Sequence, residues 1–122
     1  MERLSYIDQH AREVDANRDR TWKALLKVMC KDPHDPASVP SGFVLDAADE
    51  PARFAMSGQH WFSRYELIFE LEDEGQSRTR VLATSRGDFP GLHGKIYRAL
   101  VVGSGGHAFM VRRMLGRIAA TA

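Results

Sequence analysis

The final third of the chain constrains the fold most, because it carries one apolar stripe at helical spacing over an unusual length for 122 residues. The stripe recurs every three or four positions without a proline, which predicts a helix of about 25 residues. Such a helix is roughly 37 Å long, and one side of it must cover the core. The stripe consists of Ile96, Leu100, Gly103, His107, Met110, Met114 and Ile118.

The middle of this predicted helix is rich in glycine. Gly103, Gly105 and Gly106 surround Ser104, and each glycine costs a helix about 1 kcal/mol relative to alanine. A phosphate-binding glycine loop lies between a strand and the start of a helix, whereas here helical spacing continues on both sides. We therefore interpret the glycines as a place of close packing or a kink beside a cavity.

The composition fits a single globular domain over residues 1–122. A formal net charge of +1 predicts no general attraction to nucleic acid or to an anionic membrane, so any such binding must be local. No apolar run reaches the roughly 18 residues that cross a bilayer. The only cysteine, Cys30, cannot form an internal disulfide, and no signal-like segment follows Met1, so we expect a cytoplasmic protein.

A strand and a short helix are expected before the meander. Residues 6–14 carry polar side chains on both parities, which fits an edge strand or a strand facing a partly polar cavity. Residues 15–17 offer side-chain oxygens that can cap a helix, and prolines between residues 31 and 42 then predict a loop. The apolar residues of this helix are Trp22, Leu25, Leu26 and Met29.

From residue 42 onward the apolar period becomes two, which predicts four antiparallel strands. We expect them at residues 43–45, 53–57, 61–72 and 78–86. The third alternates most clearly, with charged residues on one face and Trp61, Tyr65, Leu67, Phe69 and Leu71 on the other. This order of elements predicts an α+β fold in which a curved antiparallel sheet wraps around a long C-terminal helix.

Three local strings accompany this order of elements. They are Val14 to Trp22, which passes from strand to helix; Gly42 to Asp46, leading to Glu50 to Arg53; and Asp88 to Tyr97, continued by Gly106-His107 and Met114-Leu115. Over nearly the whole chain, order and strings resemble the START-like helix-grip superfamily, also called SRPBCC, which includes polyketide cyclases and the birch-pollen allergen. The last string is similar to the end of one uncharacterised branch of that superfamily.

The resemblance implies an apolar cavity between the sheet and the C-terminal helix that binds a small hydrophobic molecule. The chain departs from the family in having fewer strands and a proline-rich loop at residues 31–41 where a second short helix is common. This reduced sheet implies a smaller or more open cavity. It also leaves an edge that a second subunit can cover, so a homodimer is an open alternative.

The expected ligand-binding residues lie on the third strand of the meander and on the final helix. They are Tyr65, Leu67, Phe69, Tyr97, Leu100, Gly103, His107 and Met110. Acid–base chemistry needs a proton carrier beside an enclosed pocket, and the candidates are His107, His10, Tyr97 and Asp88. For His107, three interpretations stay open: a core histidine bonded to one carbonyl, a ligand contact, or a catalytic group.

No metal or other cofactor is expected. The five histidines, at positions 10, 34, 60, 93 and 107, lack a spacing of four, and Cys30 fits a small buried hydrophobe better than a nucleophile.

Three functions stay open, of which one is an interaction module whose cavity is vestigial. The first is binding of a small hydrophobic ligand without nucleic acid as a partner. The second is a polyketide cyclase-like or dehydratase-like enzyme that uses the same cavity. A second polar partner within hydrogen-bond reach of His107 favours the enzyme. A filled core with a large apolar exterior patch favours the interaction module.

Overall fold

The computed structural model describes residues 5–60, 63–75, 77–89, 91–103 and 105–122. Within them five strands form one antiparallel sheet in the order β1-β5-β4-β3-β2. The elements are β1 (Ser5–Val14), α1 (Arg18–Met29), β2 (Phe43–Asp49), β3 (Arg53–His60), β4 (Ser63–Asp73), β5 (Thr79–Asp88), α2 (Gly91–Val101) and α3 (Gly106–Thr121).

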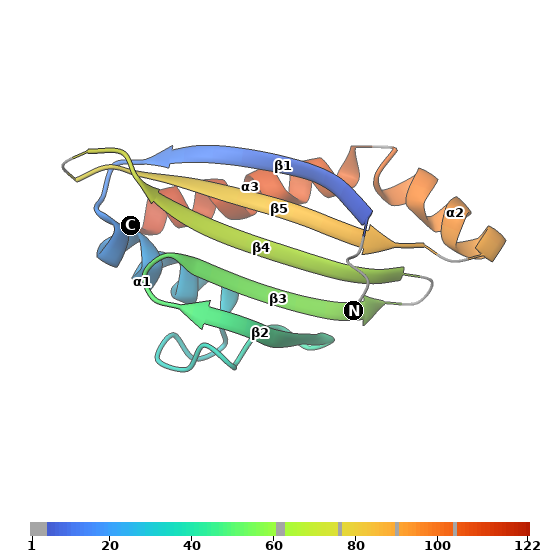
Figure 1. Ribbon diagram of the computed structural model, residues 1–122, viewed down its shortest axis with the longest axis horizontal. Helices are drawn as coiled ribbons and strands as arrows, with labels where there is room; N and C mark the ends of the chain where they lie inside the picture. Colours follow the sequence, from blue (N-terminus) through green and yellow to red (C-terminus); the bar gives the residue numbers. More distant parts are fainter. Residues whose placement is uncertain (1–4, 61–62, 76, 90, 104) are drawn as a thin grey trace.

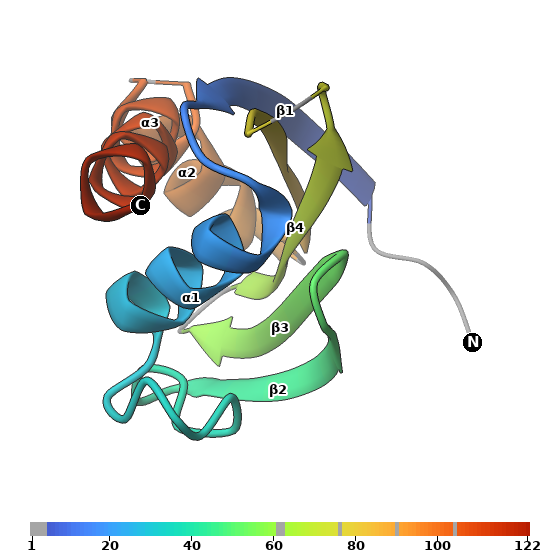
Figure 2. The ribbon, with the colours of Figure 1, turned by 90° about the vertical axis from the view of Figure 1, so that its left-hand side faces the viewer.

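The sheet curves around α1 and α3, which both lie on its concave side (Figures 1 and 2). The predicted α+β helix-grip arrangement is therefore confirmed, and the four strands of the meander are all present. Trp61, which we expected to begin the third strand of the meander, lies outside the described residues. Among the residues that the structure describes, no helix is both long and apolar enough to cross a lipid bilayer.

The mixed polarity of β1 has two causes. It is an edge strand that pairs only with β5, and a bulge interrupts its register between Tyr6 and Asp8. After the bulge, Asp8 pairs with the buried Ser85 and His10 with the buried Ala83. Since directly paired residues point to the same face of a sheet, this parity of β1 faces the helices. Both of the proposed explanations, an edge strand and a partly polar interior, therefore apply.

Apolar side chains from α1 and the sheet fill one end of the interior. The side chain of Asn17 caps α1 by accepting a hydrogen bond from the amide of Arg20 at 2.9 Å. Trp22 then packs edge-to-face on Phe54, with ring centroids 6.0 Å apart, and Phe54 contacts Phe69 at 6.5 Å. Both phenylalanines are fully buried, so this end of the molecule is a dry core.

The predicted continuous helix of about 25 residues is wrong, because the segment is divided into α2 and α3. Gly105 caps α3 with a φ of 82°, a left-handed conformation that residues with a Cβ rarely adopt. A Cβ on Gly103 would lie 2.7 Å from the carbonyl oxygen of Ala99. Both glycines are therefore needed for the change of direction, in agreement with a kink. The long C-terminal helix is α3, with 16 residues.

The alternation along β4 predicts a contrast between neighbouring residues. Replacing Phe69, fully buried against Phe54, with alanine should lower the free energy of unfolding by about 3–5 kcal/mol. Glu70 is exposed on the opposite face, and Glu70→Ala should change the free energy of unfolding by no more than about 0.5 kcal/mol. Urea unfolding of the two variants measures the difference, and equal losses would contradict the observed parity.

The helix break predicts opposite effects at two glycines of the same segment. Gly105→Ala forces a Cβ into a left-handed conformation and should destabilise the protein by about 1 kcal/mol or more. Gly116 lies inside α3, where an added Cβ would make only an ordinary contact, 3.7 Å from Arg12 Nη1. Gly116→Ala should therefore stabilise the protein by about 0.5–1 kcal/mol. Thermal unfolding of the pair checks this, and a stabilising Gly105→Ala would show that the break is not required.

Candidate functional site

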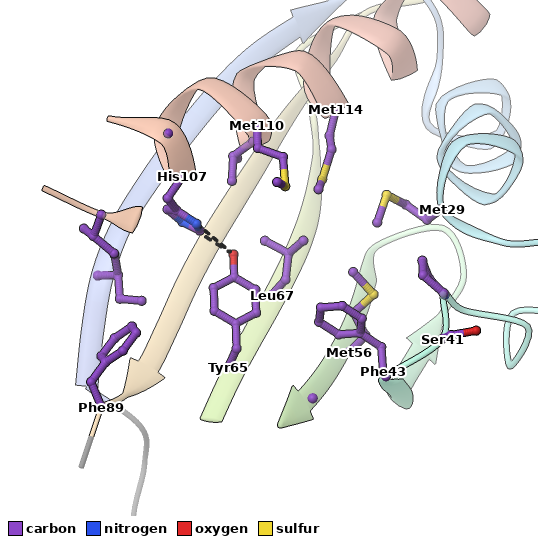
Figure 3. A pocket seen from close by; sticks show the side chains of 17 residues that line it. Met29, Ser41, Phe43, Met56, Tyr65, Leu67, Phe89, His107, Met110 and Met114 are labelled. Carbon is purple, nitrogen blue, oxygen red and sulfur yellow. Dashed lines mark hydrogen bonds between the residues drawn. The ribbon is translucent and has the colours of Figure 1, made fainter. Parts of the chain in front are cut away.

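A cavity of about 400 Å³ lies between the concave face of the sheet and the N-terminal half of α3 (Figure 3). The exposed residues of its lining are Ser41 and Gly42 on one side and Gly106 and Met110 on the other. The cavity therefore reaches the surface between the start of α3 and the loop before β2. Its lining consists of Ile7, Met29, Pro40, Ser41, Gly42, Phe43, Met56, Gly58, Tyr65, Leu67, Phe89, Val102, Gly106, His107, Met110, Val111 and Met114.

Four methionines from three elements line much of this cavity: Met29 of α1, Met56 of β3, and Met110 and Met114 of α3 (Figure 3). Methionine is unbranched and polarizable, so its side chain adapts to ligands of different shape. Phe43 adds an aromatic wall and packs edge-to-face on Tyr65, with ring centroids 6.2 Å apart. The wall is therefore apolar and adaptable over most of its extent.

The structure brings four of the predicted ligand-binding residues to this cavity: Tyr65, Leu67, His107 and Met110. Phe69 is not among the lining residues, because two positions further along β4 the interior is filled by Phe54 and other core side chains. Leu100 and Gly103 are exposed, since the chain changes direction at the glycine break and turns them away from the interior. Tyr97 lies on α2, and its side chain is outside the described part of the chain.

The other lining residues were not among the ligand-binding residues predicted from the sequence. Met56 and Met114 lie on predicted elements at core-facing positions, so alternation and helical spacing were signals that point to them. Residues 40–42 belong to a loop, where no periodicity exists to reveal orientation. Ile7 faces the cavity because of the bulge in β1, which a propensity argument cannot locate.

One group of polar side chains interrupts the apolar wall, and we call Asp8, Tyr65, Ser85 and His107 the polar cluster. Ser85 Oγ lies 3.0 Å from His107 Nε2 and 3.0 Å from the Tyr65 hydroxyl. The Tyr65 hydroxyl is 3.4 Å from His107 Nε2 and 3.5 Å from Nδ1 (Figure 3). His107 and Ser85 are buried. The side chains come from β1, β4, β5 and α3, so the whole fold is needed to assemble them.

Asp8 places a carboxylate near the imidazole of His107. Its Oδ2 lies 3.1 Å from His10 Nε2, and its Oδ1 lies 3.4 Å from His107 Nε2. Among the residues that the structure describes, the buried Oδ1 has no hydrogen-bond partner. The bulge in β1 explains this position, because it turns Ile7 and Asp8, which are adjacent in sequence, toward the interior together. Asp8 was not among the residues predicted from the sequence.

The polar cluster can both donate and accept hydrogen bonds toward the cavity. A neutral imidazole has one donor and one acceptor nitrogen, and the hydroxyls of Ser85 and Tyr65 rotate to suit either role. A carboxylate near His107 stabilises an imidazolium once it forms. The arrangement can therefore bind a polar group of a ligand or move a proton, and the interpretation of His107 as a histidine bonded only to one backbone carbonyl does not fit.

The other candidate residues lie elsewhere or have other roles. Asp88 is exposed at the end of β5, and the side chains of His60 and His93 lie outside the described part. Over the described residues, no group of three His, Cys, Asp or Glu side chains is placed to hold a metal ion. Burial raises the pKa of the Cys30 thiol above its ordinary value of 9.0, Asp35 and Asp32 add to the rise, and Ser38 partly offsets it. This opposes a nucleophilic role.

Comparisons with known proteins find similarity in structure only. The sequence matches no protein-family model. It also matches no curated protein. Among solved structures, the Mll3558 protein from Rhizobium loti has a TM-score of 0.68 at 16% identity, covering 99% of this chain and all of that one. A conserved protein from Geobacillus kaustophilus has a TM-score of 0.64 at 13% identity, over 92% of this chain and 91% of the other.

Similar structures with enzyme names are also found. The truncated norcoclaurine synthase from Thalictrum flavum has a TM-score of 0.60 at 13% identity and covers 94% of this chain and 96% of its own. The Zhui aromatase/cyclase from Streptomyces sp. R1128 has a TM-score of 0.59 at 14% identity over 95% and 94%. At such identities the likeness establishes the fold. The protein therefore has the helix-grip fold over almost its entire length.

Proposed function

We propose that the protein binds a small hydrophobic molecule that carries one polar group. The observation that supports this is the lining of the cavity, which is apolar except for Ser41 at the exposed rim and for Tyr65 and His107 of the polar cluster. In ligand sites of this type the apolar wall provides most of the binding energy and a few polar groups fix the orientation. The ligand's polar group would bind His107 together with the neighbouring Tyr65 hydroxyl, and its apolar body would contact the methionines.

The size of the cavity narrows the class of ligand. A volume of about 400 Å³ lies near the lower end of the range of roughly 300–1,000 Å³ for small-molecule sites. This favours a molecule of one or two fused rings, or a short chain, over a bulky lipid. The names of the synthase and the aromatase/cyclase with the same fold are compatible with a small molecule. A cytoplasmic location is part of the proposal and rests on the single free cysteine, Cys30.

A matched pair of probes tests the role of the polar cluster in binding. The wild-type protein should bind 2-naphthol more tightly than naphthalene, because only naphthol has a hydroxyl for His107 or Tyr65. His107→Phe keeps a ring of similar shape and should reduce this preference by about tenfold, which is about 1.4 kcal/mol. NMR titration with each probe measures the two affinities.

The control for this experiment is Met114→Leu, which changes the apolar wall and leaves the polar cluster intact. It should alter both affinities by a similar factor and keep the preference for naphthol. A preference that survives His107→Phe unchanged would contradict the proposed orientation of the ligand. Native mass spectrometry of protein purified from its source would additionally reveal the mass of a retained molecule and the number of subunits.

Acid–base catalysis in the same cavity is the second candidate function. The observation that favours it is the convergence of Asp8, Ser85 and Tyr65 on His107, since a carrier needs only one polar contact. In this hypothesis His107 removes a proton from the carbon beside a ligand carbonyl. The electron pair of that C–H bond forms the C=C bond of an enolate, and the π electron pair of the carbonyl moves to its oxygen. Tyr65 donates a hydrogen bond to this oxygen, and Asp8 stabilises the imidazolium.

Deuterium exchange into 2-tetralone tests the catalytic hypothesis. In D₂O the NMR signal of the protons on the carbon beside the carbonyl disappears as deuterium replaces them. The wild-type protein should make this loss faster than it is in buffer alone. His107→Phe should return the rate to that of buffer, and Asp8→Asn should lower it by about 100-fold while 2-tetralone still binds. Proton NMR follows both exchange and binding. If the wild-type protein binds 2-tetralone but does not raise the exchange rate above that of buffer, the catalytic hypothesis is wrong and ligand binding remains as the function.

A further inference from the structure

Exposed apolar side chains gather on α2 and the start of α3. Among the described residues, six large apolar side chains are more than half exposed, and four of them lie on these two helices. Ile96 and Leu100 are one helical turn apart on α2, and Phe109 and Met110 lie in the first turns of α3. Together with the exposed Lys95, Arg98, Arg112 and Arg113, we call these residues the α2–α3 surface.

The charge of the chain is divided unevenly, and the α2–α3 surface lies in the basic part. Residues 89–122 contain five lysines and arginines and no acidic residue, whereas residues 1–88 contain the other 12 basic residues and all 16 acidic ones. The net charge of the whole chain is therefore close to zero although residues 89–122 are strongly basic. Charge of one sign in such a region attracts partners of the opposite sign.

The order of residues on α3 places apolar and basic side chains on one outer face. His107, Val111 and Leu115 are buried, and Phe109 lies on the opposite side of the helix, as its exposed fraction of 66% shows. Arg112 and Arg113 follow Phe109 by three and four positions and are its neighbours on that side. An exposed apolar side chain flanked by basic ones can enter the interface of an anionic membrane while the cations contact the lipid headgroups.

We propose that the α2–α3 surface docks onto an anionic lipid bilayer. Leu100 and Phe109 would enter the interface between headgroups and acyl chains, while Lys95, Arg112 and Arg113 would contact anionic headgroups. A second copy of the chain fits less well, because a two-fold symmetric contact would bring these cations against their own copies. The binding is peripheral, in agreement with the lack of a membrane-crossing helix over the described residues.

The position of the cavity suggests a function for this docking, because the rim of the cavity lies beside the α2–α3 surface. Gly106 and Met110 are exposed residues of the cavity lining, and Met110 also belongs to the α2–α3 surface. A docked protein therefore holds this rim close to the acyl chains. A hydrophobic molecule can then pass between bilayer and cavity with little exposure to water. This transfer of a ligand between bilayer and cavity rests on the proposed function. Docking itself does not, and it can be measured without a ligand.

Flotation with lipid vesicles tests the docking. The wild-type chain should float with vesicles of phosphatidylcholine mixed with phosphatidylglycerol, and much less with phosphatidylcholine alone or at high salt. The double variant Leu100→Gln and Phe109→Gln should lower partitioning by about tenfold or more without a change in charge. The double variant Arg112→Gln and Arg113→Gln should lower it by a similar factor on the anionic vesicles alone.

Two controls match these variants elsewhere on the molecule. Val44→Gln removes a side chain of similar exposure, 61%, from the edge strand β2. Lys23→Gln with Lys27→Gln removes the same charge from exposed positions of α1. Both controls should bind vesicles like the wild type, and circular dichroism confirms that every variant is folded.

Three outcomes would overturn the proposal. The first is a wild-type chain that stays in solution with anionic vesicles, or controls that lose as much binding as the test variants. The second is equally strong, salt-sensitive binding to soluble polyglutamate, which would identify an acidic protein-like partner. The third is self-association in sedimentation velocity that Phe109→Gln abolishes, which would identify a second copy as the occupant.

Discussion

The packing of α3 into the concave face of the sheet is the interaction on which the rest of the structure depends. In the C-terminal half of the helix, Leu115 and Ile118 are almost completely buried in the core. Toward the N-terminus of the helix the same face carries His107, Met110 and Met114, and there the sheet encloses a cavity. One helix therefore provides both the stability of the fold and one wall of the site. The apolar contacts of Leu115 and Ile118 hold the N-terminal part of the helix at a distance from the sheet that leaves room for a ligand.

Much of the fold could be predicted from the sequence because its strands alternate and its first helix carries an N-cap and an apolar face. The division between α2 and α3 was missed because the apolar spacing continues through it, although the glycines marked the place. His107 and Tyr65 could be found, since they lie on well-patterned elements. Asp8 could not, because its orientation depends on a bulge and on pairing with β5, a strand some 70 residues away. Leu100 was misplaced for a related reason: a helical face predicts position only while the helix continues.

The polar cluster is unfavourable for stability by itself. Within the described part of the chain, Asp8 Oδ1 is buried without a hydrogen-bond partner. Such an oxygen costs free energy that an apolar side chain at the same place would not. Proteins tolerate such groups where a ligand or a reaction uses them. The buried position of this oxygen supports a role for Asp8 beyond packing in both candidate functions. It also explains why an otherwise apolar cavity keeps polar groups from four separate elements.

The polar cluster joins the first strand of the sheet to the last helix, and this has a consequence for how the protein folds. Asp8 lies on β1 and His107 on α3, so their contact closes a loop of about 100 residues. Contacts of such high sequence separation form late, because the entropy of loop closure opposes them. The site is then assembled only when folding is complete. A ligand bound there would stabilise the protein against global unfolding, because only the fully assembled chain offers the site.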